Sequence, residues 1–507
     1  MRSKKTLRNV LSNVIFNIII AFLGFAKIKV FMKSFSTDLY SLHQLFYQIF
    51  AYFTIADIGF GLVINKNLYK AFAKKDKDEI TKIYVTSKKF YNILGGILLL
   101  FAIGFSFFVN NFTKAQIDLS YMQIMFLSVI TLNIIDYFFE APKGIITADE
   151  KLYEVNYLIK GAKVLTAIIQ IGLVFLKLDY ILIMLVSIIF NLLINIYINH
   201  KIFKKYPYIS ESKNIKFNKE YLKDTKDLIP AKLSGVLNSN TDIILISTFI
   251  NPLMVNIYSS YNYIIKFVTD TTYIISAAIV PSFAAKINSD KKDSYNIFEE
   301  INIFFLFLAS FTSIMFYMLL NPLIKLWIGE EYLVSKTTLA LFVILGFQMI
   351  LRRGIDIVIN SKGYFKETKK PVFYEALLNL IISLLFIKPL GINGVLMGSI
   401  FATLFTTFIF HPIFIYKNVF KKNVIIFYLR SLIGFTISIL LAFLTSLIKI
   451  NISGVGSFIL NVILYSIIVL TVLFTLFYLI FKPMRNLTIR AKDLILNILK
   501  TRRKDER

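Results

Sequence analysis

Fourteen apolar runs fill this chain, and each is long enough to cross a lipid bilayer. A crossing helix needs about 20 mostly apolar residues, because its backbone polar groups can only be hydrogen-bonded within the helix. The runs lie at 10–31, 41–64, 85–109, 119–142, 153–176, 178–199, 229–250, 254–285, 300–324, 333–358, 372–388, 392–415, 424–448 and 456–481. The sequence therefore predicts an all-α polytopic membrane protein with about 14 transmembrane helices.

The basic residues predict how the helices are oriented. Of the 57 Lys and Arg residues, 43 lie in the N-terminal stub, the C-terminal tail and every second gap between runs, and the other seven gaps hold nine. Cytoplasmic loops retain Lys and Arg, whereas short translocated loops lose them. We therefore expect a multi-pass protein of the bacterial cytoplasmic membrane with both termini in the cytoplasm. The net charge of +27 then faces anionic headgroups, and nucleic acid is not an expected partner.

The gap lengths predict a duplicated bundle. The longest polar stretch separates six crossings from the eight that follow, and in both halves the gap after the second crossing is basic. An even number of crossings makes the two halves parallel repeats, an arrangement suited to alternating access; the alternative is a coincidence of loop lengths. The predicted parts are a six-helix bundle at 1–200, a basic cytoplasmic linker at 201–228, a second six-helix bundle at 229–416, helices thirteen and fourteen at 417–481 and a basic tail at 482–507.

The composition argues against several kinds of chemistry. The chain has no Cys, which removes disulfides and thiol catalysis, and its three His residues are scattered at 43, 200 and 411. These residues cannot form a His-rich or Cys-containing metal site. No cofactor and no metal are expected.

Four patches along the chain resemble one family of membrane transporters. They are Ala-Asp-Ile-Gly-Phe-Gly-Leu-Val-Ile at 56–64 with Leu-Tyr-Lys at 68–70, Ala-Asp-Glu-Lys-Leu-Tyr at 148–153, Asn-Thr-Asp-Ile-Ile-Leu-Ile-Ser at 240–247 with Tyr-Ser-Ser-Tyr at 258–261, and Gly-Tyr-Phe-Lys at 363–366 followed by Gly-Ile-Asn-Gly-x-x-x-Gly at 391–398. In order and spacing the patches are similar to the polysaccharide-repeat flippases. These are the Wzx-type lipid-linked oligosaccharide transporters of the multidrug/oligosaccharidyl-lipid/polysaccharide exporter (MOP) superfamily.

The sequence also departs from that family's pattern. Lys27 and Lys29 stand in the first helix where members often carry Arg, and Glu150 replaces a Gln. The resemblance implies a MATE-like fold and a flippase that moves undecaprenyl-diphosphate-linked repeat units from the inner to the outer leaflet. The substrate would feed capsule, exopolysaccharide or O-antigen assembly, with membrane lipids and polymerase or export machinery as further partners. The alternatives are a multidrug or organic-cation antiporter of the same superfamily and, less favoured, a membrane polysaccharide polymerase or ligase. No enzymatic activity is expected.

Charged residues inside the runs are candidates for the site, because a charge at bilayer depth costs about 2.5–3.5 kcal/mol on insertion scales. Lys266 is the first candidate for binding the diphosphate, since an ammonium is a compact phosphate ligand. Its alternative role is an ion pair with Asp270, four residues on, or with Asp242. Lys27 and Lys29 near the outer face are further diphosphate candidates, although such side chains also extend to the interface without a ligand.

Acidic residues are the candidates for ion coupling or gating. Asp242, Asp270, Asp57 and Glu375 fall within or beside apolar runs, and Asp57 and Glu375 lie in the predicted cytoplasmic halves with Asp136, Glu140, Arg352, Arg353 and Asp356. Such charges can close an inner mouth through ion pairs, or they can be ordinary helix-end electrostatics.

Three further patterns complete the prediction. Asn240 and Tyr261 are candidates for sugar binding, with core packing as the alternative. Gly391, Gly394 and Gly398 have the small-residue spacing that permits close helix packing. The tail from 482 to 507 alternates basic and aliphatic residues, a pattern typical of an amphipathic helix on anionic lipid.

Overall fold

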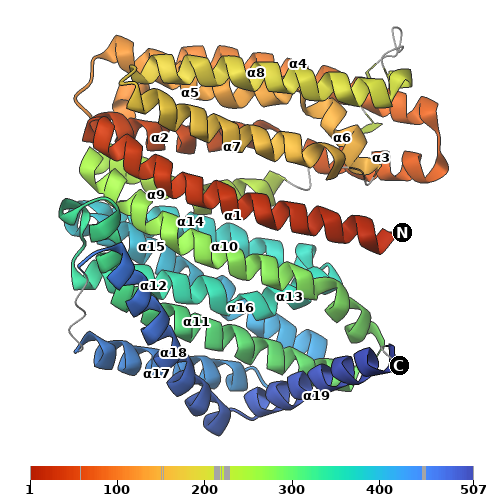
Figure 1. Cartoon of the computed structure of the whole chain (residues 1–507), viewed down its shortest axis with the longest axis vertical. Helices are drawn as coiled ribbons and strands as arrows, with labels where there is room; N and C mark the ends of the chain where they lie inside the picture. Colours follow the sequence, from red (N-terminus) through yellow and green to blue (C-terminus); the bar gives the residue numbers. More distant parts are fainter. Residues whose placement is uncertain are drawn as a thin grey trace. The chain divides into compact units, whose positions relative to one another are not determined.

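The computed structural model describes residues 2–57, 59–149, 151, 153–209, 217–218, 220–221, 229–289, 291–447 and 453–505. Within these ranges the secondary structure is helical, with no strand. The contacts divide the chain into two compact units, Met1–Asn256 and Ile257–Arg507. Each unit is a helical bundle with its own apolar core (Figure 1).

The first unit contains nine α-helices and three short 3-10 helices among the described residues. They are α1 (Arg2–Ser34), α2 (Thr37–Phe53), η1 (Thr54–Asp57), α3 (Phe60–Lys74), α4 (Lys77–Ser106), η2 (Val109–Phe112), α5 (Leu119–Phe138), α6 (Glu140–Ala148), α7 (Tyr153–Phe175), α8 (Tyr180–Lys205), η3 (Pro207–Ile209) and α9 (Ile229–Phe249). Side-chain caps begin several of them: Ser36, Asp118 and Asp179 accept hydrogen bonds from backbone N–H groups in the first turns of α2, α5 and α8. The core packs α5 against α4, α8 and α2.

The second unit contains α10 to α19 and two short helical segments among the described residues. Its elements are α10 (Pro252–Ser289), α11 (Lys291–Trp327), η5 (Glu330–Tyr332), α12 (Lys336–Leu351), α13 (Arg353–Lys362), α14 (Phe365–Leu390), α15 (Ile392–Phe405), α16 (Thr407–Phe414), the π-helix η6 (Ile415–Phe420), α17 (Ile425–Ser446), α18 (Val455–Ile480) and α19 (Lys482–Asp505). The central helix is α11, which packs against α12, α17, α18 and α19. The predicted helices thirteen and fourteen are α17 and α18.

Every predicted apolar run falls on one to three consecutive helical elements. In the described part of the chain, ten helical segments are long and apolar enough to cross a membrane, or eleven if the bent pair at 37–74 counts as one span. The chain is therefore a multi-pass membrane protein, while the count of 14 stays a prediction. The count differs because some runs are divided: α12 is only 16 residues long and is followed at once by α13.

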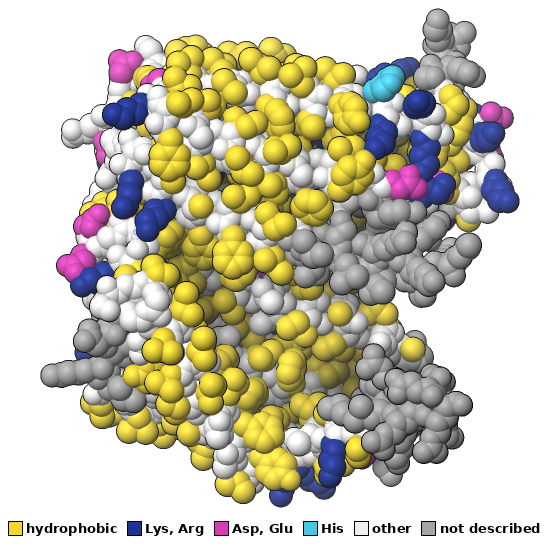
Figure 2. All heavy atoms as spheres, viewed as in Figure 1, with side chains coloured by type: hydrophobic (Ala, Val, Ile, Leu, Met, Phe, Trp, Pro, Cys, Tyr) yellow, Lys and Arg dark blue, Asp and Glu magenta, His cyan; other side chains and the backbone are white. Residues whose placement is uncertain are grey.

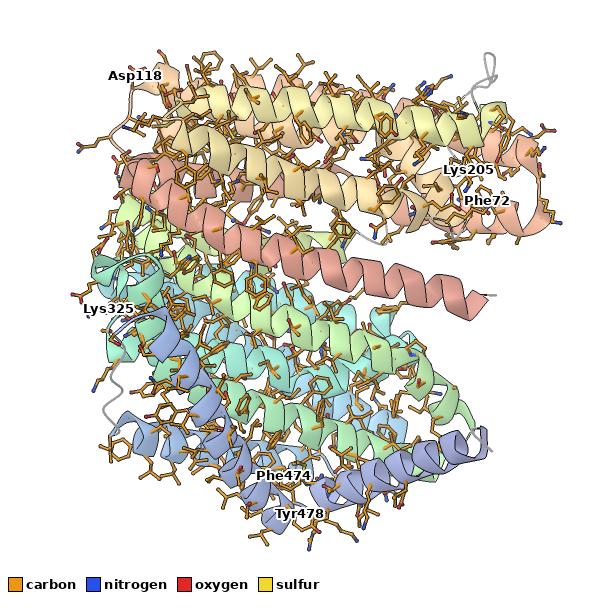
Figure 3. The ribbon with its side chains drawn as sticks, viewed as in Figure 1. Phe72, Asp118, Lys205, Lys325, Phe474 and Tyr478 are labelled. Atoms are coloured by element: carbon orange, nitrogen blue, oxygen red, sulfur yellow. The ribbon has the colours of Figure 1, made fainter. Side chains whose placement is uncertain are left out.

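In the first unit, the gaps predicted to be cytoplasmic meet at one end. The Tyr206 hydroxyl donates a 2.7 Å hydrogen bond to Asp149, and Lys205 forms an ion pair with Glu154. Burial and the neighbouring Asp149 carboxylate raise the pKa of Tyr206, so this hydroxyl stays protonated as a donor. Figure 3 shows Lys205 at this end and Asp118 at the other. Alternate gaps therefore lie at opposite ends of the unit, as the basic residues predict.

Exposed aliphatic and aromatic side chains cover the flanks of the helices between those ends. Leu193 on α8 and Leu100 on α4 are more than half exposed. Figure 2 shows an apolar surface over the first unit's helices, with Lys and Arg gathered toward the end where α8 finishes. An apolar flank between polar ends is the surface expected of helices in contact with lipid.

The contacts group α9 with the first unit, although the sequence assigns it to the second bundle. It packs against α2, and the Thr248 hydroxyl donates a 3.2 Å hydrogen bond to the Phe112 carbonyl before the start of α5. The predicted linker at 201–228 falls mostly outside the described residues, and the domain boundaries stay predictions.

Candidate functional site

Two of the predicted crossings break beside charged residues. In the first unit the fourth predicted crossing divides between α5 and α6 at Phe139, directly before Glu140. In the second unit the tenth predicted crossing divides between α12 and α13 at Arg352. Broken helices free backbone polar groups inside a membrane protein, where they are tolerated beside protein or a cavity, and transporters place sites at such points. We therefore take the charged networks at these breaks as candidate site elements.

The first unit pairs Asp57 with Lys232. Asp57 ends η1, the turn that follows α2, and its Oδ2 atom lies 2.9 Å from Lys232 Nζ on α9. Both side chains are about one quarter exposed, and the second Asp57 oxygen has no hydrogen-bond partner among the described residues. The turn is completed by Gly59, whose φ of 69° suits glycine. This ion pair joins the second and seventh predicted crossings.

A second cluster in the first unit surrounds Lys143 on α6. Its Nζ lies 3.8 Å from Asp136 and 3.9 Å from Glu140, across the break between α5 and α6. Asn195 on α8 donates a 2.9 Å hydrogen bond to Asp136. The cluster thus ties α8 to the broken crossing.

The second unit gathers a denser network around Arg352. The Arg352 guanidinium lies 3.4 Å from Asp356 and 3.7 Å from Glu375, and Arg353 lies 3.5 Å from Asp356. Glu375 on α14 is buried, and its two oxygens accept hydrogen bonds from Thr403 at 3.1 Å and from Thr407 at 2.5 Å. The structure therefore brings together four charges that the sequence places separately in cytoplasmic helix halves.

His411 joins this network, and sequence reasoning missed it. The buried His411 Nε2 atom lies 3.4 Å from the Thr368 carbonyl. A cavity of about 10 Å³, just large enough for one water molecule, is lined by Arg352, Asp356, Thr403, Thr407 and His411 together with apolar side chains. The available signal was a histidine inside an apolar run, a residue type that is rare and functional at bilayer depth.

Lys266 and Asp270 lie one turn apart on α10, and the ion pair between them that is the alternative role for Lys266 does not form. Within the described residues, Lys266 has no carboxylate at ion-pair distance, and it is partly buried. Asp270 is exposed, and its carboxylate attracts the Arg353 guanidinium electrostatically. That guanidinium also lies 5.2 Å from the centre of the Tyr273 ring. Among the described residues of its own unit, Lys266 therefore has no carboxylate that could neutralise an ammonium.

Lys27 and Lys29 on α1 are also partly buried and form no ion pair in the described part of the chain. The Lys27 ammonium lies 5.0 Å from the centre of the Phe31 ring. Behind that ring, His43 contacts the Tyr180 hydroxyl at 2.5 Å in a buried aromatic cluster. The aromatic contact partly compensates the burial of the Lys27 ammonium.

Of the remaining candidates, Asn240 and Tyr261 have partners that fit a structural role, while Asp242 is buried. Asn240 donates a 3.0 Å hydrogen bond to the Val236 carbonyl of its own helix. Asp242 is buried on α9, beside Thr241, whose hydroxyl lies 2.5 Å from that of Tyr52. The fully buried Tyr261 hydroxyl donates to Asn321 at 2.5 Å, and its ring stacks on Phe342. Sugar binding by Asn240 and Tyr261, and ion coupling at Asp242, stay predictions.

The described residues contain no group of three or more His, Asp or Glu side chains arranged to hold a metal ion. What the two units do contain is a set of cations and ion pairs inside apolar helices. Such an arrangement can bind an anionic group or change its pairing between two conformations.

Solved structures share this arrangement of helices. The lipid II flippase MurJ, in an inward closed conformation, matches with a TM-score of 0.64 at 15% identity, over 92% of this chain and 99% of that chain. A MATE family multidrug resistance transporter of the MOP superfamily matches in its inward-facing conformation with a TM-score of 0.58 at 13% identity, over 84% of this chain and 95% of that one. An outward-facing conformation of such a transporter gives 0.54 at 14% identity, over 88% and 97%.

No family model and no curated protein sequence matches the chain. At identities this low, the structural matches establish the fold alone. They cover 84–92% of this chain and 95–99% of the matched chains. The chain therefore has the all-helical fold shared by MurJ and the MATE transporters, as its sequence predicts.

Proposed function

We propose that this protein is a flippase that moves undecaprenyl-diphosphate-linked oligosaccharide repeat units from the inner to the outer leaflet of the bacterial cytoplasmic membrane, for capsule, exopolysaccharide or O-antigen assembly. The observation that carries the proposal is that Lys266, in a helix apolar enough to cross a membrane, and Lys27 on α1 have no carboxylate at ion-pair distance among the described residues. A buried cation is costly in hydrocarbon, so an anionic substrate group that compensates it would recover that cost. The fold match to a lipid II flippase adds support.

The proposed mechanism is alternating access controlled by ion pairs. The pairs between Asp57 and Lys232 and between Arg352 and Glu375 each join separate predicted crossings. Such a pair can form in one state and break in another, because moving a helix by a few ångströms removes most of the attraction. Asp242, Asp270 and Glu375 are the acids proposed to couple an ion or to gate. In this account the termini are cytoplasmic.

A multidrug or organic-cation antiporter is the second candidate function. Acidic residues favour it: Asp57 has an oxygen without a hydrogen-bond partner among the described residues, and Asp242 is buried on α9. The fold matches to MATE transporters are compatible with it. An organic cation would be attracted by these carboxylates, whereas a diphosphate would be attracted by the lysines.

The proposal is tested by removing single cations. Lys266→Ala and Lys27→Ala should each lower glycolipid translocation in proteoliposomes at least several-fold, because each removes a proposed diphosphate contact. Lys325→Ala is the matched control, since Lys325 is an exposed lysine that pairs with Glu330 near the end of α11. Translocation at the wild-type rate in both interior variants, with normal insertion, would contradict the assignment.

A further inference from the structure

The C-terminal helix α19 starts where an apolar crossing helix ends. α18 runs to Ile480, Phe481 adopts an extended conformation with φ −107° and ψ 112°, and α19 begins at Lys482. α18 is long and apolar enough to span a membrane. One extended residue leaves α19 little room to move away from the level at which α18 leaves the hydrocarbon. Its first turns therefore lie at the membrane surface.

One face of α19 is fixed to the second unit (Figure 1). Met484 is buried in the core cluster around α11, and Leu487 packs against the same cluster. Arg490 Nε lies 2.9 Å from the Glu300 carboxylate, and its Nη2 atom lies 3.5 Å from Asp293. These contacts hold the helix at one rotation about its axis.

That rotation turns two large aliphatic side chains outward. Ile489 is 57% exposed and Leu496 is 44% exposed. They are seven residues apart, so they lie on one line along the helix. Three exposed cations lie on the same outward side, within about 60° of the direction of Ile489 when each residue turns the helix by about 100°: Lys482, Arg485 and Lys492. The outer face of α19 is thus an aliphatic pair bordered by cations, and Asp493 is the acid beside it.

We infer that the outer face of α19 binds the anionic lipid headgroups of the membrane that α18 crosses, with Ile489 and Leu496 inserted at the headgroup–acyl boundary. Aliphatic side chains bordered by Lys and Arg are the chemistry of helices that lie in an anionic membrane interface. The start of α19 beside the end of α18 places that surface within reach. A second protein would need a complementary acidic patch to bind this face. The membrane surface needs no such partner, because α19 begins where α18 leaves the membrane.

This inference extends the sequence prediction in one respect. The sequence predicts an amphipathic tail, but not which face meets the lipid; Leu487 faces the protein and Ile489 faces away from it. Because Arg490 joins α19 to Glu300 and Asp293, and Asp293 lies 2.7 Å from Lys286 on α10, lipid bound on the outside would hold α19 against the α10–α11 junction. The inference does not depend on the transported substrate, so the two proposals can fail separately.

The natural chain has no cysteine, which makes single-site labelling of the full-length protein direct. Ile489→Cys and Leu496→Cys would carry a nitroxide label in vesicles of phosphatidylcholine with or without phosphatidylglycerol. Ala491→Cys is the matched control, because Ala491 is exposed on the same helix about 200° from Ile489. Accessibility of the label to oxygen in lipid and to a water-soluble nickel chelate reports its depth.

We expect labels at 489 and 496 to be more accessible to oxygen and several-fold less accessible to the nickel chelate than the label at 491 in vesicles that contain phosphatidylglycerol. Reversing the charges with Arg485→Glu and Lys492→Glu in the Ile489→Cys background should reduce that difference. Equal aqueous accessibility at 489 and 491 in both lipids would overturn the inference. Labels at 489 and 496 that are shielded from both reagents would also overturn it, because they would indicate a protein partner.

Discussion

Glu299 on α11 has partners from two other elements, although it is buried in a membrane protein. Its carboxylate accepts a hydrogen bond from the Tyr416 hydroxyl on η6 and forms an ion pair with Arg430 on α17. Only 6% of the Glu299 side chain is exposed. The cost of burying this charge is offset only while both partners remain in place. The three residues therefore fix α17 to α11.

Replacing one member of this pair should cost more stability than replacing both. Glu299→Leu leaves the Arg430 charge inside the bundle, and we expect a loss of about 3–5 kcal/mol, the range for breaking a buried pair. Glu299→Leu with Arg430→Met removes both charges and should recover part of that loss. Thermal unfolding of the purified proteins in one detergent measures both. A double variant less stable than Glu299→Leu alone would contradict the argument.

The pair between Asp57 and Lys232 belongs to transport rather than to stability in the proposed mechanism. Asp57→Asn and Lys232→Gln should each lower translocation several-fold, because the pair can no longer close one state. The exchange Asp57→Lys with Lys232→Asp should restore part of the rate. The pair of Lys325 and Glu330, whose side chains are 56% and 68% exposed, is the control and should be insensitive to the same treatment. Failure of the exchange to exceed either single variant would argue against a gating pair.

At the scale of elements, the hairpin of α14 and α15 depends on two glycines. A Cβ at Gly394 would overlap the Phe386 carbonyl, and one at Gly398 would overlap the Ser383 hydroxyl. Gly391 joins the helices with a φ of 57°. The prediction that these glycines permit close packing agrees with the contacts between α14 and α15.

Gly394→Ala should therefore destabilise the protein by about 1–3 kcal/mol, the usual cost of overpacking. Gly104→Ala on α4 is the control, because its Cβ would meet no atom within 4 Å. That control should be neutral or slightly stabilising, since alanine favours a helix. The midpoints of thermal unfolding compare the two. Equal midpoints would show that α14 can move away from α15 at little cost.

The apolar runs predict the helices well because hydrocarbon leaves a spanning chain few alternatives to the α-helix. The breaks were harder to predict. The break between α12 and α13 falls at Arg352, with no proline beside it, and the following glycine, Gly354, packs against Asn302 of α11. The break therefore depends on tertiary contacts, which a single sequence does not contain.

At the scale of the whole molecule, one part of the candidate site could be predicted from the sequence and another part could not. The presence of charges inside the helices could be read from the sequence, and their cost in hydrocarbon is the reason to propose them as a site. Which charges pair could not be predicted: Glu375 meets Arg352 and Thr407 through three separate helices, and His411 enters the network from the same helix as Thr407. Lys266 and Asp270 show the converse, since suitable spacing on one helix did not produce an ion pair.

The orientation of the chain in the membrane can be tested with the same cysteine-free background. Lys114→Cys and Lys204→Cys replace exposed lysines near opposite ends of the first unit, where Figure 3 shows Asp118 and Lys205. In intact cells, a membrane-impermeant maleimide should label position 114 and leave position 204 unlabelled until the cells are opened. The positive-inside distribution of Lys and Arg is the reason for this expectation. Labelling of position 204 alone in intact cells would show that the chain has the opposite orientation in the membrane.

The most direct test of the proposed function is the movement of a diphosphate-linked glycolipid across the bilayer of proteoliposomes, with efflux of an organic cation measured on the same preparation. The proposal predicts that glycolipid reaches the opposite leaflet faster than in protein-free vesicles, that Lys266→Ala slows this movement, and that cation efflux stays at the background rate. Efflux of the cation without movement of the glycolipid would contradict the flippase and favour the antiporter.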